Sequence, residues 1–401
     1  MKILMAVVSD LRSDARVRRE AAALAADGHD VRVVGFDSGV RRAGSTVEEG
    51  VRYDVVPFPS RNLPRPLRLA RAGLGAARAA LLMARGRPDA VHCHNLHLSL
   101  PALLVARRHG AALVYDAHEL EACKHRGPVR RLIERWERLV WCRSQARITT
   151  NPSRAEYLER LHGSRPTVVG NYPRTPGPGM EPKDLRARLG IPRERLVLIF
   201  QGGFYLESRC FRTVAAALRE LPEWHWVLIG FGSDDTVRKL RELVAECGIE
   251  DRTAILPAVP VDELLSYTAG ADVGVVALTD SGPNCYLGDT NKLFEYLMAG
   301  LAVVGSDFPE VRRAVLEGPA GPTGVLFDPA SSASVARALR EAAAGLPTFR
   351  RNAVNARAAY SWETESRTLT HLYRALAAPR GAEPATDTGR RAEPSGLPKG
   401  A

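Results

Sequence analysis

The chain has 401 residues, of which 45% are hydrophobic and 25% are charged, and its formal net charge is +11. This composition is that of a globular protein, the length suits two domains of similar size, and no run of eighteen apolar residues suggests a membrane span. The six cysteines show no pair at metal-binding spacing, which favours reduced thiols without disulfides. The stretch Met1–Val8 is too short for the apolar core of a signal peptide, so we expect a first strand there, in a cytoplasmic protein.

The positive charge favours an anionic partner but does not choose among a nucleotide, a membrane and a nucleic acid. Nucleic acid is the weakest of the three, because the basic residues are not interleaved with aromatic residues and no nucleic-acid-binding module is visible. We therefore expect no nucleic-acid partner.

Residues 1–170 alternate short β-branched runs with longer amphipathic segments, a pattern typical of a parallel sheet covered on both faces. The predicted strands are Lys2–Val8, Asp30–Phe36, Tyr53–Pro57, Ala90–Cys93, Ala112–Tyr115, Ala146–Thr150 and Thr167–Val169. The predicted helices are Ala15–Ala26, Leu67–Arg85, Leu98–Arg108, Val129–Arg143 and Arg154–Leu161. Four prolines and three glycines between Gly170 and Pro182 predict an interdomain linker at residues 171–182.

A second α/β unit is predicted for residues 183–360. Its strands are expected at Leu196–Phe200, Trp226–Ile229, Thr253–Leu256, Val273–Val276, Ala302–Val304 and Gly324–Leu326, with a helix from Phe211 to Leu221 and further helices between the other strands. Residues 361–378 are predicted to form a helix that packs back on the first domain, and residues 379–401 to be disordered. Two doubly wound domains place the ligand site at the carboxyl ends of their strands, in the cleft between them.

The segment Asn291–Asp307 is the most informative part of the chain. It predicts a helix that ends at Gly300 and leads into a buried strand, with Glu295 as the one acidic residue in an otherwise apolar helix. A helix N-terminus binds anions, and here Thr290, Asn291 and Lys292 stand at that end. The alternative is that Asn291 only caps the helix and that Glu295 is solvated.

The segment resembles the donor-binding signature of the nucleotide-sugar-dependent retaining glycosyltransferases of family 4, which have the GT-B fold of two Rossmann-like domains facing across a cleft. The resemblance implies that the helix N-terminus faces the diphosphate of the donor and that Glu295 binds the nucleotide ribose. It also implies sugar transfer without a metal ion or other cofactor. The second domain would bind the nucleotide sugar, and the first would bind the acceptor.

The loop Phe200–Arg209 resembles the phosphate-binding loop of the same family, with Gly202 and Gly203 at the turn and Arg209 at the basic position. Two positions depart from the family pattern. Many members have a second basic residue where this chain has Gly203, and many have a glutamate where it has Leu287. The second departure leaves the donor sugar open; Asp289 could act instead, although a solvent-facing loop position is the simpler interpretation.

His118 follows a predicted buried strand in the sequence Tyr115-Asp116-Ala117-His118-Glu119. The resemblance places a histidine here opposite the donor sugar and the leaving diphosphate, so we expect His118 to be catalytic. The alternative is a structural histidine.

Other polar residues of the first domain are candidates for the acceptor side. His92, His94 and His97 could form an H-x-H-x-x-H metal site, but no suitably placed carboxylate joins them in the sequence, so we expect no metal. We expect His94 and Asn95 to line the acceptor side. Asp14 and Arg16, in a variant Asp-x-Arg-Val-x-Arg-Glu-Ala motif, are further candidates, although a helix cap followed by a charged face is equally compatible.

The segment 124–143 predicts a basic amphipathic helix with two tryptophans. We favour a helix that packs on the sheet through Leu132, Trp136 and Leu139 over one that lies on an anionic membrane at the inner face of the cell.

The sequence thus predicts a retaining glycosyltransferase that moves a sugar from a nucleotide diphosphate to a hydroxyl of a glycan, lipid-linked or natural-product acceptor. The alternatives are a nucleotide-sugar epimerase of the same fold and a sugar-nucleotide-binding protein with impaired catalysis. Neither the base, the sugar nor the acceptor follows from the sequence.

Overall fold

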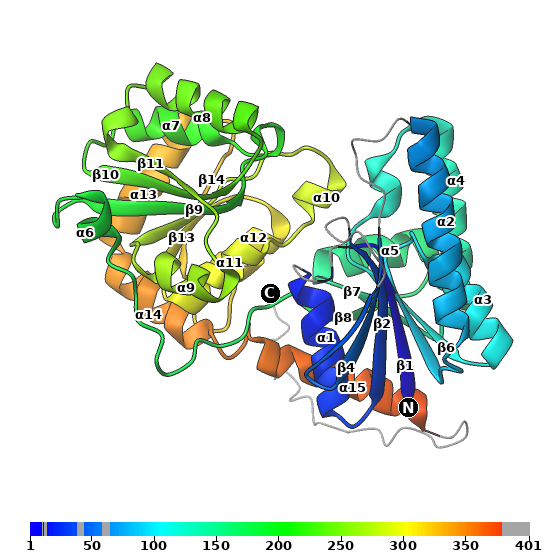
Figure 1. The fold of residues 1–401 in the computed structure, drawn as a ribbon. Helices are drawn as coiled ribbons and strands as arrows, with labels where there is room; N and C mark the ends of the chain where they lie inside the picture. The colour runs from blue at the N-terminus through cyan, green and yellow to red at the C-terminus, as the bar shows by residue number, and fades with distance from the viewer. Residues whose placement is uncertain (10, 12–13, 38–43, 58–64, 379–401) are drawn as a thin grey trace, which may run out of the picture.

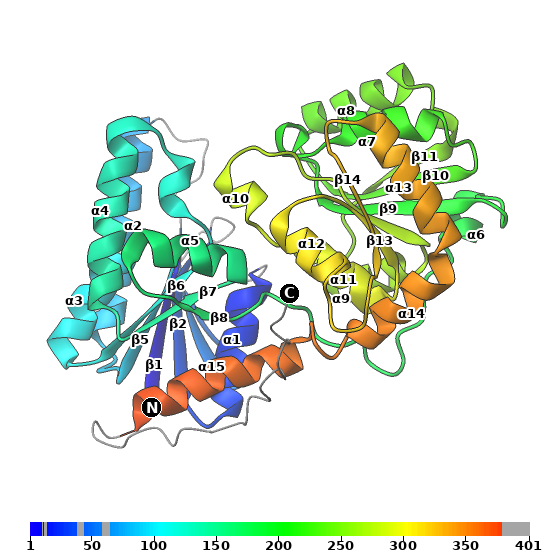
Figure 2. The same ribbon diagram turned by 180° about the vertical axis from the view of Figure 1, so that it is seen from behind.

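The computed structural model describes residues 1–9, 11, 14–37, 44–57 and 65–378 (Figures 1 and 2). The chain forms two α/β domains, each with a central sheet flanked by helices on both faces, and the two domains lie side by side. The predicted fold class is confirmed. The predicted tail at 379–401 lies outside the described residues.

The sheet of the first domain has eight strands in the order β3-β4-β2-β1-β5-β6-β7-β8. All neighbours pair in parallel except β3 and β4, which are antiparallel. The strands are β1 Lys2–Val7, β2 Asp30–Asp37, β3 Gly44–Glu48, β4 Val51–Pro57, β5 Ala90–His94, β6 Ala112–Ala117, β7 Ala146–Thr149 and β8 Thr167–Val168.

The second sheet is wholly parallel and has the order β11-β10-β9-β12-β13-β14. Its strands are β9 Leu196–Gly203, β10 Trp224–Phe231, β11 Thr253–Pro257, β12 Val273–Val276, β13 Ala302–Ser306 and β14 Gly324–Phe327.

The helices of the first domain are α1 Ala15–Ala26, α2 Arg65–Ala84, α3 Ser99–His109, η1 Glu121–Lys124, α4 Gly127–Arg143 and α5 Pro152–His162. Those that follow are α6 Leu185–Leu189, η2 Leu206–Ser208, α7 Phe211–Arg219, α8 Asp234–Glu246, η3 Glu250–Arg252, α9 Val261–Ala269, α10 Pro283–Tyr286, α11 Asn291–Ala299, α12 Pro309–Val315, α13 Ser332–Ala344, α14 Leu346–Ala356 and α15 Trp362–Ala377. Among the described helices, none combines the length and apolar character needed to cross a bilayer.

Alternation along the strands divides each core into two layers. In β1, Ile3 and Met5 pack against the α1 and α15 side of the sheet, whereas Leu4 packs on the opposite face. In β9, Ile199 and Phe200 point to opposite faces in the same way. Strands buried on both faces are almost continuously apolar, which is why their positions were readable from the sequence.

Strand β3 was not predicted. All five of its residues are exposed, and it pairs with β4 at the edge of the sheet. No buried face imposes an alternating pattern on it, so the sequence carries no hydrophobic signal for this strand.

Helix α15 returns from the end of the second domain to the first, where it packs beside α1 (Figure 2). Trp362, Leu369 and Tyr373 are buried in the layer of core that contains Ile3 and Met5. The backbone N–H of Trp362 also donates to the carbonyl of Pro173, at 2.9 Å. This bond joins the two segments of the chain that pass between the domains.

Side-chain hydrogen bonds also join the two domains. The amide group of Asn284, on α10, bonds to both backbone groups of Leu120, at 2.7 and 3.0 Å. Glu310, on α12, accepts from the backbone N–H of Ser153 at the start of α5, at 2.9 Å. These bonds hold the carboxyl ends of the two sheets toward each other.

Candidate active site

The second-domain side of the cleft is built from the end of β9 and the start of α11. Gly202 has φ +112°, a conformation that favours glycine, and its open face lies next to the side chain of Lys292. Tyr296 fixes α11 against the sheet, since its hydroxyl bonds to the backbone of Gln201 and Val275. A Cβ at Gly274 would lie 2.3 Å from the Tyr296 ring, so the packing of α11 requires glycine there.

Two buried cations, Lys292 and Arg209, stand at this end of the sheet. Lys292 is 7% exposed, donates to Thr290 Oγ1 at 3.0 Å and lies over the Phe200 ring. Arg209 bonds only to the neighbouring Ser208, and its Nε is buried without a partner. Within the described part of the chain, neither forms an ion pair. Burial and the charge of Arg209 lower the pKa of Lys292 to about 7, and burial lowers the pKa of Arg209.

Glu295 faces Gln201 rather than bulk solvent. Its carboxylate accepts a hydrogen bond from Gln201 Nε2, and Gln201 Oε1 in turn accepts from Thr268 Oγ1 at 2.5 Å. Burial raises the pKa of Glu295, while Gln201 and Lys292 oppose that rise. The interpretation of Glu295 as a solvated helical residue is therefore wrong.

None of the described side chains caps the N-terminus of α11, although the N–H of Leu293 in its first turn donates to the Thr290 carbonyl at 2.9 Å. Asn291 instead accepts from Asn171 at 2.8 Å, and Asn171 accepts from Arg19 of α1 at 2.6 Å. Burial and the charge of Arg16 lower the pKa of Arg19 to about 10. Arg19 was missed in the sequence because a helical arginine shows no sign of facing a cleft.

The two departures from the family pattern have structural counterparts. A Cβ at Gly203 would lie 2.4 Å from the Tyr205 ring, so an aromatic side chain covers the place of a second basic residue. Leu287 packs on the core of the first domain, and its carbonyl accepts from Asn151 at 3.1 Å. Asp289 accepts from the same Asn151 at 2.7 Å. Asp289 is thus an interdomain contact, and its interpretation as a solvent-facing residue is wrong.

His118 follows β6 on the first-domain side of the cleft. Its backbone N–H donates to Asn95 Oδ1 at 3.1 Å, and Asn95, which follows β5, has φ +58°. The His118 carbonyl accepts a hydrogen bond from Arg154, in the first turn of α5. Residues of two other segments, Asn95 after β5 and Arg154 on α5, therefore hold the His118 backbone in place.

Behind His118 lies a buried polar cluster, which we define as Arg16, Glu20, His92, His94 and Asp116. Arg16 lies 2.9 Å from Glu20 and 3.1 Å from Asp116, and it donates to the carbonyl of Val169 at 2.8 Å. Although burial disfavours their charges, Asp116 and Arg16 stabilise one another: the pKa of Arg16 is raised and that of Asp116 is held well below its usual range. Burial raises the pKa of Glu20 to about 8.

The acceptor-side prediction is wrong for two of its four residues. Arg16 is 5% exposed and His94 is fully buried, so both lie behind His118 and not on the cleft surface. Asp14 caps α1 through the backbone N–H of Val17, which is the helix-cap alternative. Asn95 is half-buried and positions the His118 backbone. Glu20, His92 and Asp116 were not predicted as site residues, because they meet only when β5, β6 and α1 pack together.

Glu20, His92, His94 and Asp116 place one potential ligand atom each within 4.8 Å of one another. The premise that no carboxylate joins these histidines is therefore wrong. Two histidines and two carboxylates suit a divalent metal, but the Arg16 guanidinium already occupies both carboxylates, and its positive charge would repel a second cation. In this arrangement the cluster binds an arginine, not a metal.

The packing prediction for α4 is confirmed for Trp136, which is half-buried against the core and donates to Ser99 Oγ at 2.9 Å, and is wrong for the two leucines. Leu132 is 69% exposed and Leu139 is 40% exposed, whereas Glu137, Val140 and Trp141 are buried. The Tyr115 hydroxyl donates to Glu137 at 2.9 Å, which turns a charged position inward. A prediction that places only apolar residues in the core assigns Glu137 to the surface.

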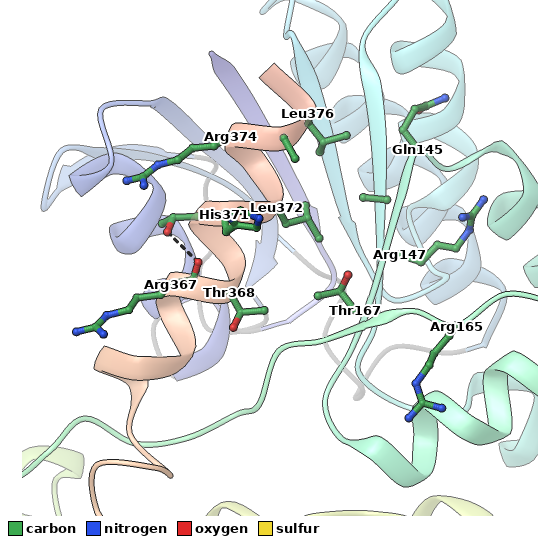
Figure 3. A pocket seen from close by; sticks show the side chains of 13 residues that line it. Gln145, Arg147, Arg165, Thr167, Arg367, Thr368, His371, Leu372, Arg374 and Leu376 are labelled. Atoms are coloured by element: carbon green, nitrogen blue, oxygen red, sulfur yellow. Dashed lines mark hydrogen bonds between the residues drawn. The ribbon is translucent and has the colours of Figure 1, made fainter. Parts of the chain in front are cut away.

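A large groove between α15 and the strands β7 and β8 lies outside the cleft (Figure 3). It has a volume of about 960 Å³ and several arginines. Arg374 pairs with Asp27, Arg165 with Glu159 and Arg147 with the carbonyl of Trp141. We do not assign this groove a ligand.

Comparisons with known proteins agree with this architecture. Residues 13–172 match the family model of the glycosyl transferase 4-like domain, and residues 195–344 match that of glycosyl transferases group 1. The chain is therefore a GT-B glycosyltransferase, an enzyme that transfers a sugar from a nucleotide-sugar donor.

Three individual proteins illustrate the similarity. D-inositol 3-phosphate glycosyltransferase 1 of Catenulispora acidiphila is 27% identical over 325 residues, 75% of each chain. Sucrose-phosphate synthase of Thermosynechococcus elongatus has a TM-score of 0.75 at 20% identity and covers 94% of this chain and 99% of its own. Anabaena HepE, in complex with UDP-glucose, has a TM-score of 0.68 at 17% identity, with 94% and 100% covered. The epimerase alternative is not favoured by these similarities.

Proposed function

We propose that the enzyme binds the diphosphate of its donor between Arg209, Lys292 and the N-terminus of α11, and transfers the sugar with retention of configuration. The observation that carries this proposal is the pair of buried, unpaired cations beside the N-terminus of α11. Two cations that repel each other in a buried site are stabilised by an anion. A diphosphate carries the charge and the oxygen atoms that this site requires.

The same groups would lower the barrier to transfer. Negative charge grows on the diphosphate as the bond to the sugar breaks, and fixed donors are most effective where charge develops. Lys292 and Arg209 supply positive charge there, so we propose that no metal ion is needed. Glu295, held by Gln201, would bind the ribose hydroxyls, with Gly202 and Gly203 allowing the backbone to approach the nucleotide.

On the other side of the cleft, His118 would face the donor sugar. Of the described residues around the cleft, none combines an activated hydroxyl or thiol with a general base. We propose that the acceptor hydroxyl attacks on the face of the leaving group and that a diphosphate oxygen takes its proton. This geometry gives retention without a covalent enzyme intermediate.

A thermal-shift screen against nucleoside diphosphates and their sugars tests the donor site. UDP and UDP-glucose are the first probes, because HepE was solved with UDP-glucose. We expect stabilisation of the wild-type enzyme and of Arg212→Ala, an exposed α7 arginine paired with Glu246, but not of Arg209→Ala. Equal stabilisation of both variants would refute the diphosphate assignment. Product analysis then identifies the anomeric configuration, and activity that persists in EDTA would support metal independence.

We further propose that the first domain contacts an anionic membrane. Helices α2, α3 and α4 lie side by side on one face, with α3 in contact with both others (Figure 1). Their exposed leucines are Leu74, Leu81, Leu100, Leu104, Leu132 and Leu139. Exposed arginines on the same helices are Arg78, Arg107, Arg108, Arg131, Arg135 and Arg138. Apolar side chains among cations fit the interface of an anionic bilayer.

Co-sedimentation with vesicles tests this contact. We expect salt-sensitive binding to phosphatidylserine-containing vesicles and none to phosphatidylcholine alone. Leu132→Ser should weaken binding, whereas Val261→Ser, which removes an even more exposed apolar side chain from α9 of the second domain, should not. Equal binding to both vesicle types, or no binding, would remove the proposal without affecting the donor site.

A further inference from the structure

Three polar groups of the first domain converge on one ring nitrogen of His118. His118 Nε2 lies 2.8 Å from Asp116 Oδ2, 3.0 Å from His94 Nδ1 and 3.2 Å from Arg16 Nε. The other ring nitrogen, Nδ1, forms no hydrogen bond within the described part of the chain, and the side chain is 15% exposed. The imidazole therefore has a fully engaged inner edge and an open outer edge.

The three contacts compete for a single position on Nε2, which carries either one hydrogen or one lone pair. A carboxylate oxygen carries only lone pairs, so the 2.8 Å contact with Asp116 requires a hydrogen on His118 Nε2. Arg16 Nε also directs its hydrogen at this nitrogen, but from 3.2 Å, and its charge is paired with the Glu20 carboxylate at 2.9 Å. The contact with Asp116 is the shortest of the three and is strengthened by the charge of the carboxylate. The hydrogen therefore belongs on Nε2 of His118.

We propose that Asp116 is the positioning residue of His118: it holds the ring as the Nε2–H tautomer, so that Nδ1 presents a lone pair to the cleft. A ring held in this way accepts a hydrogen bond from a hydroxyl of the donor sugar. The proposal rests on the proposed role of His118 in sugar transfer. Asp116 itself is fully buried and acts through the histidine.

The surrounding cluster keeps Asp116 in place. Arg16 NH2 donates to both of its oxygens, at 3.1 and 3.3 Å. His92 Nε2 lies 3.5 Å from Asp116 Oδ2, and His92 Nδ1 bonds to the Tyr373 hydroxyl at 2.9 Å. Tyr373 belongs to α15, so a helix that follows the second domain in the chain supports the catalytic histidine of the first. The outer shell of a site commonly fixes its tautomer and orientation in this way.

Nitrogen NMR of the wild-type protein tests the hydrogen placement directly. With ¹⁵N-labelled histidine, and the His118 signals identified by their loss in His118→Gln, we expect a pyrrole-type shift for Nε2 and a pyridine-type shift for Nδ1. The reverse assignment would overturn the proposal. This measurement needs no substrate, so it stands apart from any failure of the proposed glycosyl transfer.

Substitution of Asp116 tests the consequence for transfer. In Asp116→Asn the amide can donate to Nε2 and move the hydrogen to Nδ1, so kcat should fall on the order of a hundredfold while the donor KM changes little. The matched control is Asp54→Asn. Asp54 is a buried carboxylate on β4 that pairs with Arg32 of β2, outside the proposed site. Wild-type kcat and pH profile in a folded Asp116→Asn would contradict the assignment. If that variant does not fold, the wild-type spectrum decides alone.

Discussion

The two sides of the cleft arrange buried charge in opposite ways. In the second domain, Lys292 and Arg209 repel each other and have no counter-ion within the described part of the chain. In the first domain, Arg16 is bonded to Asp116 and paired with Glu20. Both sites are buried, but only the first domain satisfies its charges with its own residues.

This difference separates a site built for a ligand from a site built to hold a side chain. Unpaired buried cations destabilise the empty protein and gain stability when an anion binds. A closed network gains nothing from an anion but fixes the orientation of what it touches, here His118.

The largest effect is expected for His118→Ala, which should lower kcat by about a hundredfold to ten-thousandfold, because it removes a positioned group at the reacting sugar. The donor KM should change much less. His109→Ala, at the far end of α3, is the control and should retain activity. Steady-state kinetics check both, and an unchanged kcat in His118→Ala would assign His118 a structural role only.

Arg209→Ala should weaken donor binding about tenfold to a hundredfold, since a charge-assisted bond to phosphate contributes about 1.5–3 kcal/mol. Glu295→Ala should have a similar or smaller effect through the ribose. Isothermal titration calorimetry measures both against Arg212→Ala. Unchanged nucleotide affinity in Arg209→Ala and Glu295→Ala would place the nucleotide elsewhere.

The low pKa of Lys292, about 7, predicts a pH-dependent donor affinity. A bound diphosphate raises this pKa, so binding takes up a proton above pH 7 and the affinity falls as the pH rises further, by about tenfold per unit at most. Titration calorimetry of a nucleotide sugar in two buffers of different ionisation enthalpy measures the uptake. Lys292→Arg, which stays charged, should bind without it; equal uptake in both would exclude Lys292 as its source.

The smallest effect concerns Glu20 in the closed network. Its pKa is raised by burial from 4.5 to about 8, so the native state holds a proton that the unfolded state has lost, and stability falls as the pH rises through this window. Glu20→Gln should therefore gain stability relative to the wild type between pH 5 and pH 8, seen as a Tm difference that widens by a few degrees. Glu246→Gln, exposed on α8, is the control. A difference that does not change with pH would show that Arg16 keeps Glu20 ionised.

Much of the fold was predictable because buried parallel strands leave a strong apolar signal. The predicted strands overlap the observed ones in both sheets, whereas the exposed edge strand β3 was missed. The residues that we propose for the donor side could also be selected from the sequence, because Gly202, Arg209, Lys292 and Glu295 lie in two local segments, near the end of β9 and at the start of α11. The spacing of residues within one local segment can be read directly from the sequence.

What the sequence by itself determined is therefore the α/β class, the two domains and the segment at Asn291–Asp307 that faces the cleft. Only the tertiary structure decided which charges are paired. Arg16 and His94 are polar residues near the cleft in sequence, yet packing of α1 against β5 and β6 encloses them with Asp116. Leu287 and Asp289 likewise became interdomain contacts. The pairing of charged side chains depends on contacts between segments that are distant in the sequence. Hydrophobic periodicity is a local pattern and does not predict such contacts.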